Sequence, residues 1–395
     1  MNMPDHFKFF LKTNNRIDRN EFSGSFGDMG TTIPLLIGMI NNCNINSTGV
    51  FISFGLVQIL TGFIYGLPMP VQPLKAMAII MITRKLSPSI LYGAGLAIGI
   101  TMFLLTLTGI LDKLATLIPL CVIRGIQLAL GLSLAGLAVK EYIPSGGIAG
   151  YILAVSGFMI ILFFFGNRKY PPALFLLFIG IIYAGLMRIN SLKIGLDLSL
   201  PVINIPDINS ILQGFFILAL PQIPLSISNS IIATKQTITD LFPGKNISAK
   251  KIGITYSIMN FINPFLGGIP TCHGAGGLAG YYAFGARTGG AVIITGTVYL
   301  LSGFFFGHSL GEIIKLFPLP LLGVILLFES INLMMFARDM FETKKNLFIC
   351  LLVALIGYNL PNGYIIGLLI GTVTSWLIDN RIILTWWITE NKRYS

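Results

Sequence analysis

The sequence predicts an all-α polytopic membrane protein of about fourteen transmembrane spans, arranged as two inverted repeats of seven with one broken helix in each. Three observations support this. Of the 395 residues, 54% are hydrophobic and only 10% are charged, whereas a soluble domain carries roughly a quarter charged residues. Apolar stretches long enough to cross a bilayer recur along the whole length. Two of these stretches, one in each half, are interrupted by proline and glycine, as in proteins that bind ligands at mid-membrane depth.

The first half is predicted to hold seven spans behind a polar, basic arm. Residues 1–20 are expected to form a cytoplasmic N-terminal arm, and residues 21–190 the first repeat. Its first span begins with an unusually polar and glycine-rich stretch, residues 24–32. The expected spans are residues 22–40, 48–66, 70–83, 90–110, 118–138, 148–165 and 171–187.

The second half, residues 208–380, is predicted to cross the bilayer in the opposite sense, because an odd number of spans precedes it. The motif around Pro34 is paralleled by that around Pro224, and the break at Pro73 by a break at Pro270. Residues 381–395 are expected to form a cytoplasmic tail. The expected spans are residues 209–233, 252–267, 270–285, 289–307, 316–335, 346–358 and 363–378.

The charge pattern predicts both termini in the cytoplasm of a multi-pass cell-membrane protein. With fourteen spans and a cytoplasmic N-terminus, most lysines and arginines fall on the inner side, as the positive-inside rule requires. The net charge of +11 therefore reflects membrane topology rather than nucleic-acid binding. Besides its substrate, the protein is expected to contact membrane lipid and not nucleic acid.

Each half contains one apolar stretch that breaks at proline. Residues 66–78 carry three prolines before the helix-forming run, and residues 267–280 carry one, followed by a glycine-rich run. Proline lacks an N–H and pushes the preceding residue toward extended geometry, so each stretch should be extended and then become helical. A helix start exposes unpaired amides and a partial positive charge, which favour an anion. The substrate-binding residues predicted here are Gln72, Lys75, Thr271, Cys272, His273, Gly274 and Ala275.

For either segment alone, the alternative is a proline kink with glycine-mediated helix packing. The matched pair favours a binding site. Free histidine titrates near physiological pH, so His273 could donate to an oxyanion, shuttle a proton, or serve only as a hydrogen-bonding residue.

The charged residues inside the spans leave several roles open. A charge in a membrane should face a cavity or a partner. Lys75 could add positive charge for an anion, pair with Asp28, or snorkel to an interface. Asp28 and Glu329 are candidate proton or coupling sites, although Asp28 could instead pair with Lys75 and Glu329 could lie beside Arg338.

The eighth expected span carries a polar face. Gln222, Ser226 and Asn229 follow i, i+4, i+7 spacing, which places them on one side of a helix. This face could line the cavity, with Gln222 and Ser226 as substrate-binding residues, or form interhelical hydrogen bonds.

No enzyme, cofactor or metal site is predicted. The four cysteines are scattered without a CxxC pair, so a metal cluster or disulfide framework is not expected. The sequence lacks a P-loop and the GxSxG and HExxH motifs, so neither direct use of ATP nor these hydrolytic chemistries is indicated.

Three segments resemble the molybdate transporter family, a branch of the sulfate-permease-like superfamily. They are FGD at 26–28, PMPVQPLKA at 68–76 and HGAGGLAGYYAFGARTG at 273–289. The resemblance covers nearly the whole chain. It implies a seven-plus-seven fold with core and gate domains, shared with sulfate permeases and nucleobase transporters. It also implies uptake of an oxyanion bound between the third and tenth spans.

Two details of the resemblance narrow the expectation. Sulfate permeases usually carry a C-terminal regulatory domain, and this chain stops at Ser395 without one, which fits the molybdate branch. Nucleobase carriers place acidic residues in the eighth and tenth spans, where this chain has Gln222, Ser226 and His273. A nucleobase substrate is therefore disfavoured.

We accordingly expect a secondary transporter that imports molybdate, with sulfate or tungstate as further substrates, coupled to protons. The alternatives are a nucleobase or carboxylate proton symporter of the same fold, or an anion channel. A homodimer is left open.

Overall fold

The computed structural model describes residues 15–111, 117–164, 172–188, 196 and 198–380, and it is almost entirely helical. The predicted arm at 1–20 therefore lies mostly, and the predicted tail at 381–395 wholly, outside the described residues. In the first half the elements are α2 (Arg19–Gly24), α3 (Met29–Cys43), α4 (Ser47–Tyr65), β1 (Gln72–Pro73), α5 (Lys75–Arg84), α6 (Pro88–Leu107), α8 (Leu120–Leu137), η1 (Ala138–Tyr142), α9 (Gly147–Phe163) and α10 (Pro172–Arg188).

The second half begins with a long composite helix, in which two π-helical segments, η2 and η3, alternate with α-helical ones. Its elements are α11 (Ile208–Gly214), η2 (Phe215–Ala219), α12 (Leu220–Leu225), η3 (Ser226–Ala233), α13 (Thr234–Leu241), α14 (Ala249–Phe265), β2 (Thr271–Cys272), α15 (Ala275–Ala283), α16 (Gly290–Leu316), α17 (Leu319–Met335), η4 (Phe336–Glu342), α18 (Lys344–Asn359) and α19 (Gly363–Asp379).

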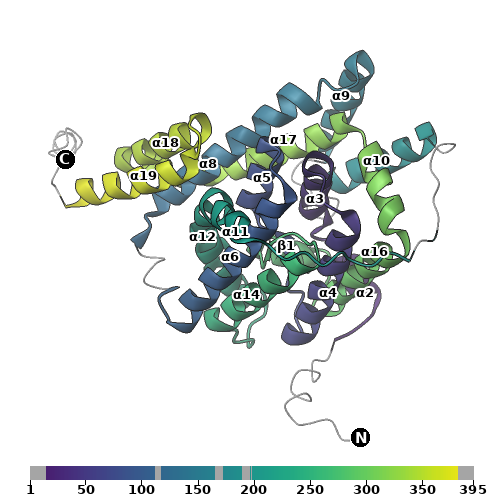
Figure 1. Cartoon of the computed structure of the whole chain (residues 1–395), viewed down its shortest axis with the longest axis horizontal. Helices are drawn as coiled ribbons and strands as arrows, with labels where there is room; N and C mark the ends of the chain where they lie inside the picture. Colours follow the sequence, from purple (N-terminus) through teal and green to yellow (C-terminus); the bar gives the residue numbers. More distant parts are fainter. Residues whose placement is uncertain (1–14, 112–116, 165–171, 189–195, 197, 381–395) are drawn as a thin grey trace, which may run out of the picture.

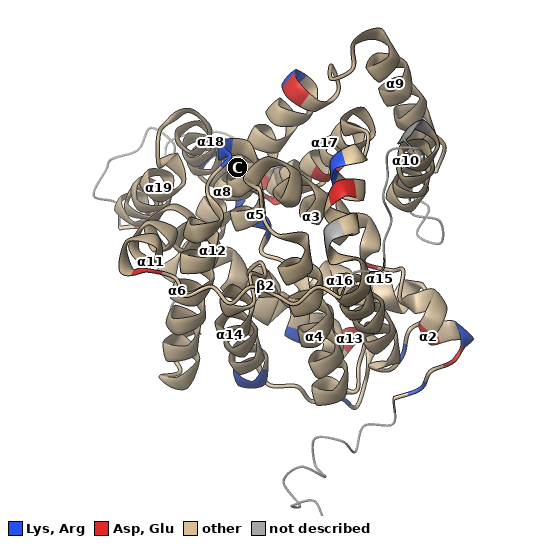
Figure 2. Ribbon diagram, turned by 45° about the vertical axis from the view of Figure 1, so that its right-hand side comes forward, with Lys and Arg blue, Asp and Glu red and all other residues tan. Residues whose placement is uncertain are grey.

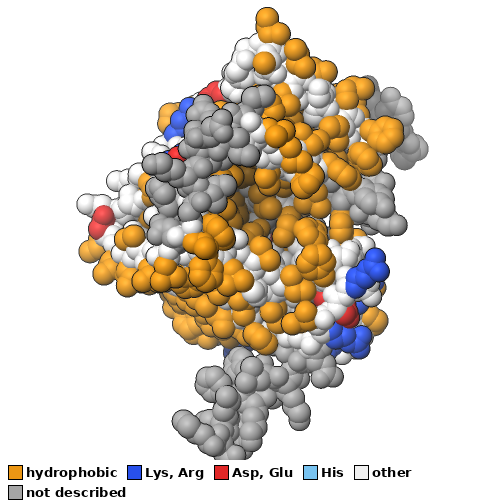
Figure 3. Space-filling view, turned by 90° about the vertical axis from the view of Figure 1, so that its right-hand side faces the viewer, with side chains coloured by type: hydrophobic (Ala, Val, Ile, Leu, Met, Phe, Trp, Pro, Cys, Tyr) orange, Lys and Arg blue, Asp and Glu red, His pale blue; other side chains and the backbone are white. Residues whose placement is uncertain are grey.

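The helices are long and apolar enough to support the membrane assignment. Within the described residues, six helices have the length and hydropathy to cross a bilayer, and three shorter ones are also apolar. The large apolar side chains left exposed, such as Ile148 and Phe163 on α9, suit contact with lipid. Orange side chains cover much of the face in Figure 3, and few charges interrupt the ribbons in Figure 2. The count of fourteen spans remains a prediction.

The helices form two groups (Figure 1). The core group comprises α2 to α6 and α11 to α16, in which α4 packs on α16 and α6 packs on α11 and α14. The gate group comprises α8 to α10 and α17 to α19, in which α8 packs on α17 and α18. These groups meet where α5 contacts α8 and where α3 contacts α10 and α17.

The two broken segments are built alike. In each, a helix ends and is followed by a glycine with positive φ, Gly66 (φ 58°) after α4 and Gly267 (φ 68°) after α14. This left-handed conformation suits glycine, because it has no Cβ to clash. The chain then runs extended through β1 or β2 and restarts as the short helix α5 or α15. Both restarts are therefore held inside the core group.

One close backbone contact holds α15 against the first expected span. A Cβ on Gly280 of α15 would lie 2.4 Å from the carbonyl oxygen of Gly27, whereas a Cβ on Gly276 of the same helix would meet no atom within 4 Å.

This contact predicts the effect of an alanine at Gly280. We expect Gly280→Ala to lower the thermal unfolding midpoint in detergent by several degrees, because the backbones must separate. Gly276→Ala, the matched control, should leave this midpoint unchanged or raise it. Equal midpoints for the two variants would contradict the contact.

Candidate functional site

The two breaks meet directly. β1 pairs with β2 in antiparallel register, with Gln72 opposite Cys272 and Pro73 opposite Thr271. The amide of Leu74, the residue before α5, donates to the carbonyl of Pro270 at 3.1 Å. The two proline breaks, which the resemblance places on either side of a bound oxyanion, therefore lie side by side. As a result, α5 and α15 start from one shared two-stranded ladder.

Asparagines of α14 satisfy the extended backbone of the second break. Asn260 accepts from the amide of Thr271 at 3.0 Å and donates to its carbonyl at 2.7 Å. Asn263 donates to the carbonyl of Ile269 and to the Thr271 hydroxyl, each at 2.9 Å. Both asparagines are fully buried. Irregular backbone at this depth is stable only when its polar groups find protein partners, and α14 supplies them.

The start of α5 is already capped by a side chain. The Gln222 carboxamide oxygen, from α12, accepts from the amides of Ala76 at 2.9 Å and Met77 at 3.4 Å. The Gln222 nitrogen donates to Ser226, whose hydroxyl lies 2.8 Å from that of Tyr256. In this structure, Gln222 and Ser226 therefore form the interhelical hydrogen bonds that were one of the two alternatives for the polar face of this span.

The start of α15 is open. The backbone amides of Ala275, Gly276 and Gly277 have no hydrogen-bond acceptor within the described part of the chain. Gly276 is exposed, and no atom stands where its Cβ would be. Three unpaired amides at a helix start form an anion-binding surface.

Asp28, the residue preceding α3, lies beside this open start. It is buried, with only 4% of its surface exposed. Its carboxylate accepts from the hydroxyls of Thr31 and Thr32, each at 3.0 Å, and from the side-chain amide of Gln72. A Cβ on Gly277 would lie 3.0 Å from the Asp28 carboxylate. A carboxyl group that can gain or lose a proton is thus placed against the start of α15.

Lys75 pairs with Glu329, not with Asp28. Its ammonium lies 2.5 Å from the Glu329 carboxylate on α17, and the two side chains are 37% and 11% exposed. Arg338 instead lies 3.6 Å from Asp339, so the expected alternative of a Glu329–Arg338 neighbourhood is not realised. Lys75 also interacts electrostatically with the carboxylate of Asp28. This ion pair links the core group to the gate group.

His273 is used within the protein. Its ring Nδ1 lies 2.9 Å from the Pro70 carbonyl, which can only accept, and its Nε2 lies 2.8 Å from the Thr255 hydroxyl. The ring is fully buried. Its Nδ1 joins the second break to the first, and its Nε2 joins the second break to α14. Thr271 is equally buried and accepts from Asn263. Both side chains are engaged with protein partners, and their contacts with an oxyanion stay a prediction.

One buried carboxylate that caps a helix was not anticipated from the sequence. Glu21 of α2 is 2% exposed and accepts from the amides of Arg287, Thr288 and Ala291 at 2.8–2.9 Å. It thereby caps the start of α16. The only sequence signal is an acidic residue in an otherwise polar first turn, and its partners lie about 270 residues away.

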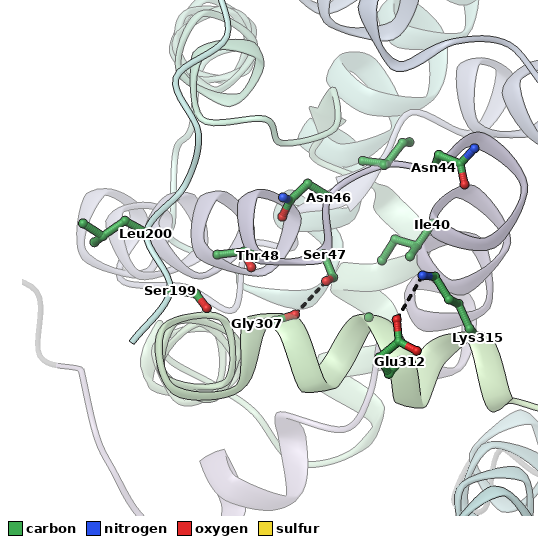
Figure 4. A pocket seen from close by; sticks show the side chains of 12 residues that line it. Ile40, Asn44, Asn46, Ser47, Thr48, Ser199, Leu200, Gly307, Glu312 and Lys315 are labelled. Carbon is green, nitrogen blue, oxygen red and sulfur yellow. Dashed lines mark hydrogen bonds and ion pairs between the residues drawn. The ribbon is translucent and has the colours of Figure 1, made fainter. Parts of the chain in front are cut away.

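Two cavities need to be distinguished. One of about 330 Å³ lies between α3, α10 and α17 and reaches both Thr31 and Glu329. The other, of about 530 Å³, lies near the ends of α3 and α16 and is lined by Asn46, Ser47 and Lys315 (Figure 4). Lys315 there pairs with Glu312 at 3.0 Å. The first cavity, not the second, connects with the candidate site. Within the described residues no cluster of metal ligands occurs.

The sequence comparisons decide the family. Residues 20–134 and 214–333 match the family model described as a molybdate transporter of the MFS superfamily. The chain belongs to this molybdate transporter family. It is 34% identical over 409 residues to molybdate transporter 1 of Arabidopsis thaliana, covering 90% of this chain and 89% of that protein. It is 35% identical over 390 residues to molybdate transporter 2 of the same plant, covering 85% and 82%.

The fold of this molybdate transporter family member matches two solved anion transporters. The transmembrane domain of the cyanobacterial bicarbonate transporter BicA aligns with a TM-score of 0.64 and 16% identity, covering 92% of this chain and 99% of that domain. Murine Slc26a9 in the inward-facing state aligns with a TM-score of 0.71 and 14% identity, covering 96% and 72%. The predicted sulfate-permease-like fold class is confirmed.

The Lys75–Glu329 pair predicts a non-additive mutational effect. Glu329→Ala leaves a half-buried ammonium unpaired, so it should lower the unfolding midpoint in detergent more than Lys75→Ala does. Because the second mutation then removes the orphaned charge, the double variant should lose less free energy of unfolding than the two single variants lose together. The difference should be about 1 kcal/mol. A loss in the double variant equal to the sum of the single losses would contradict the pair.

Proposed function

We propose that this chain is a secondary active transporter that imports molybdate, with protons as the coupling ion. The observation that supports this proposal most directly is the open start of α15. Its three unpaired amides follow the ladder at which the two breaks meet. Family membership supports the substrate, since the relatives from Arabidopsis thaliana are named molybdate transporters. The fold, shared with solved anion transporters, supports transport of an anion.

A tetrahedral dianion would be held chiefly by α15. The amides of Ala275, Gly276 and Gly277 supply directed hydrogen bonds, and the helix supplies a partial positive charge. The Gln222 cap occupies the first amides of α5, so α5 contributes mainly through the ammonium of Lys75. Hydrogen bonds that involve a charged partner are about twice as strong as neutral ones, which suits a ligand with two negative charges.

Proton coupling would follow from two carboxyl groups that oppose the anion. Asp28 lies against the α15 start, where its ionised form would repel a dianion. Glu329 holds the Lys75 ammonium and competes with the anion for it. Protonation of either group removes one negative charge from the site and strengthens oxyanion binding, so proton and substrate would bind together.

The same ion pair connects binding to movement. Lys75 belongs to the core group and Glu329 to the gate group. When the anion takes over Lys75, this link between the groups is lost, and the core group is free to move against the gate group. An elevator-like or rocking motion of this kind would expose the site to the two sides of the membrane in turn.

Titration calorimetry of the purified protein tests the substrate. Molybdate should bind, uracil should not, and Lys75→Ala should weaken molybdate binding about tenfold or more, because one charge-assisted contact is lost. Lys75→Arg, which keeps the charge, should lose less. No heat with molybdate or sulfate between pH 5 and 8 would reject the proposal. Large ohmic currents in a planar bilayer would indicate a channel instead.

Asp28→Asn tests the proton coupling. In proteoliposomes, an inward proton gradient should accelerate molybdate uptake by the native chain. The asparagine variant carries no titratable proton at this position, so the stimulation of uptake by the gradient should fall to the part that Glu329 supplies, while exchange of molybdate for molybdate persists. Thr32→Val, which removes one hydrogen bond to Asp28 but keeps its carboxyl, is the control and should stay gradient-sensitive. Unchanged stimulation in Asp28→Asn would exclude this carboxyl as the proton carrier.

A further inference from the structure

A third cavity lies at the opposite end of α5 from the candidate site. Its volume is about 270 Å³. The C-terminal end of α5 forms one wall, and α8, η1, α18 and α19 form the other, so this cavity also lies between the core and gate groups. The residues that matter to the argument are Arg84, Ser133, Lys140, Glu141, Tyr358 and Tyr364.

This cavity carries an excess of positive charge. Arg84 and Lys140 form no ion pair with any residue that the structure describes. The one acidic residue in the lining, Glu141, is 2.8 Å from Lys85. Arg84 is steadied by the ring of Tyr364, whose centroid lies 5.7 Å from the guanidinium carbon. Two cations thus face a polar cavity without a neutralising acid.

The neutral lining includes hydroxyl groups that can donate hydrogen bonds. Tyr358 and Tyr364 contribute phenolic hydroxyls, and the Tyr364 hydroxyl lies 2.9 Å from that of Ser133. Arginine offers a planar fork of N–H groups that matches oxyanion geometry. The cavity in Figure 4 differs in kind, because its lysine, Lys315, is paired with Glu312. Of these two cavities, only the one at Arg84 has cations available to a ligand.

We propose that the Arg84–Lys140 cavity is a second oxyanion-binding site, a vestibule that captures the substrate dianion before it reaches the start of α15. This inference rests on the proposed function for its ligand. α5 has ten residues, so the two sites are separated by about 15 Å at ~1.5 Å of rise per residue. Clefts lined by one sign of charge raise the local concentration of oppositely charged ligands and their association rates. On the predicted topology, this end of α5 faces the outside.

Thiol labelling in the cavity reads its charge directly. Gly136 lines the cavity, and a Cβ there would meet its nearest atom, the Tyr358 hydroxyl, at 3.6 Å, an ordinary contact. Gly136→Cys should therefore fold, and the four native cysteines are buried. In purified protein, an anionic methanethiosulfonate should label this thiol faster than a cationic one, each rate being normalised to a free thiol. Molybdate should slow the labelling.

Arg84→Gln with Lys140→Gln, in the same cysteine background, should lower the anion-to-cation labelling ratio about tenfold and abolish protection by molybdate. The effect should fade at high salt, since the Debye length falls to about 3 Å at 1 M. Lys315→Gln is the matched control and should change neither the ratio nor the protection. The decisive protein is Gly136→Cys with the native Arg84 and Lys140. An anion-to-cation labelling ratio near one in that protein, or no protection of its thiol by molybdate, would overturn the vestibule.

Molybdate uptake by proteoliposomes of the same preparation separates this inference from the proposed function. Uptake without protection of the cysteine rejects the vestibule and leaves the transport function standing. Protection without uptake supports the vestibule and rejects the transport function. With both observed, the double glutamine variant should show a lower kcat/KM for uptake at low ionic strength, with kcat retained.

Discussion

The antiparallel pairing of β1 with β2 is the contact on which the rest of this structure depends. Two short extended segments, each interrupted by proline and buried among helices, satisfy one another's backbone where no water is available. That pairing brings the starts of α5 and α15 together, although about 200 residues separate them. Asn260 and Asn263 of α14 and the ring of His273 then complete the hydrogen bonding of the breaks. The polar residues of this region thus serve first to make an irregular backbone tolerable, and only the groups left over can serve a ligand.

This division explains how far the sequence could predict the site. Proline spacing identified both breaks, and the recurrent apolar stretches located the helices, because these signals act through local backbone geometry and burial. The resemblance carried by residues 68–76 and 273–289 identified the family. The partner of Lys75 could not be predicted, since Asp28 and Glu329 are both acidic and only the tertiary fold, which brings Glu329 of α17 to Lys75, selects between them. The cap formed by Glu21 on α16 was missed for the same reason, and interhelical bonding by Gln222 was anticipated without its acceptor role at α5. A capping side chain that comes from a distant element leaves no local pattern in the sequence.

The two ends of α5 differ in how their positive charges are neutralised. This difference distinguishes the candidate site at Lys75 from the cavity at Arg84. At the N-terminal end, positive charge is restrained: Glu329 neutralises Lys75, and the carboxyl of Asp28 lies nearby. A site that bound a dianion without such opposition would release it slowly, whereas opposing carboxyl groups make binding conditional on a proton. At the C-terminal end, Arg84 and Lys140 have no such opposition within the described residues. Weak, unconditional attraction is what a capture site requires, and conditional attraction is what a coupled site requires.

The dipole of α5 weakens anion binding at the Arg84 end of the helix, which the side-chain charges alone do not show. The positive end of α5 lies at the breaks, so its negative end lies at Arg84, where it attenuates the attraction of a dianion. The C-cap residue Lys85 adopts a left-handed conformation with φ 51° and donates its amide to the carbonyl of Met81, which satisfies one of the terminal carbonyls. Arg84 and Lys140 must then supply the remaining positive potential through their side chains. The dipole of α5 therefore favours an anion at the breaks and opposes one at Arg84, where only side-chain charge attracts it, so a dianion moving along α5 passes from a shallow site to a deeper one.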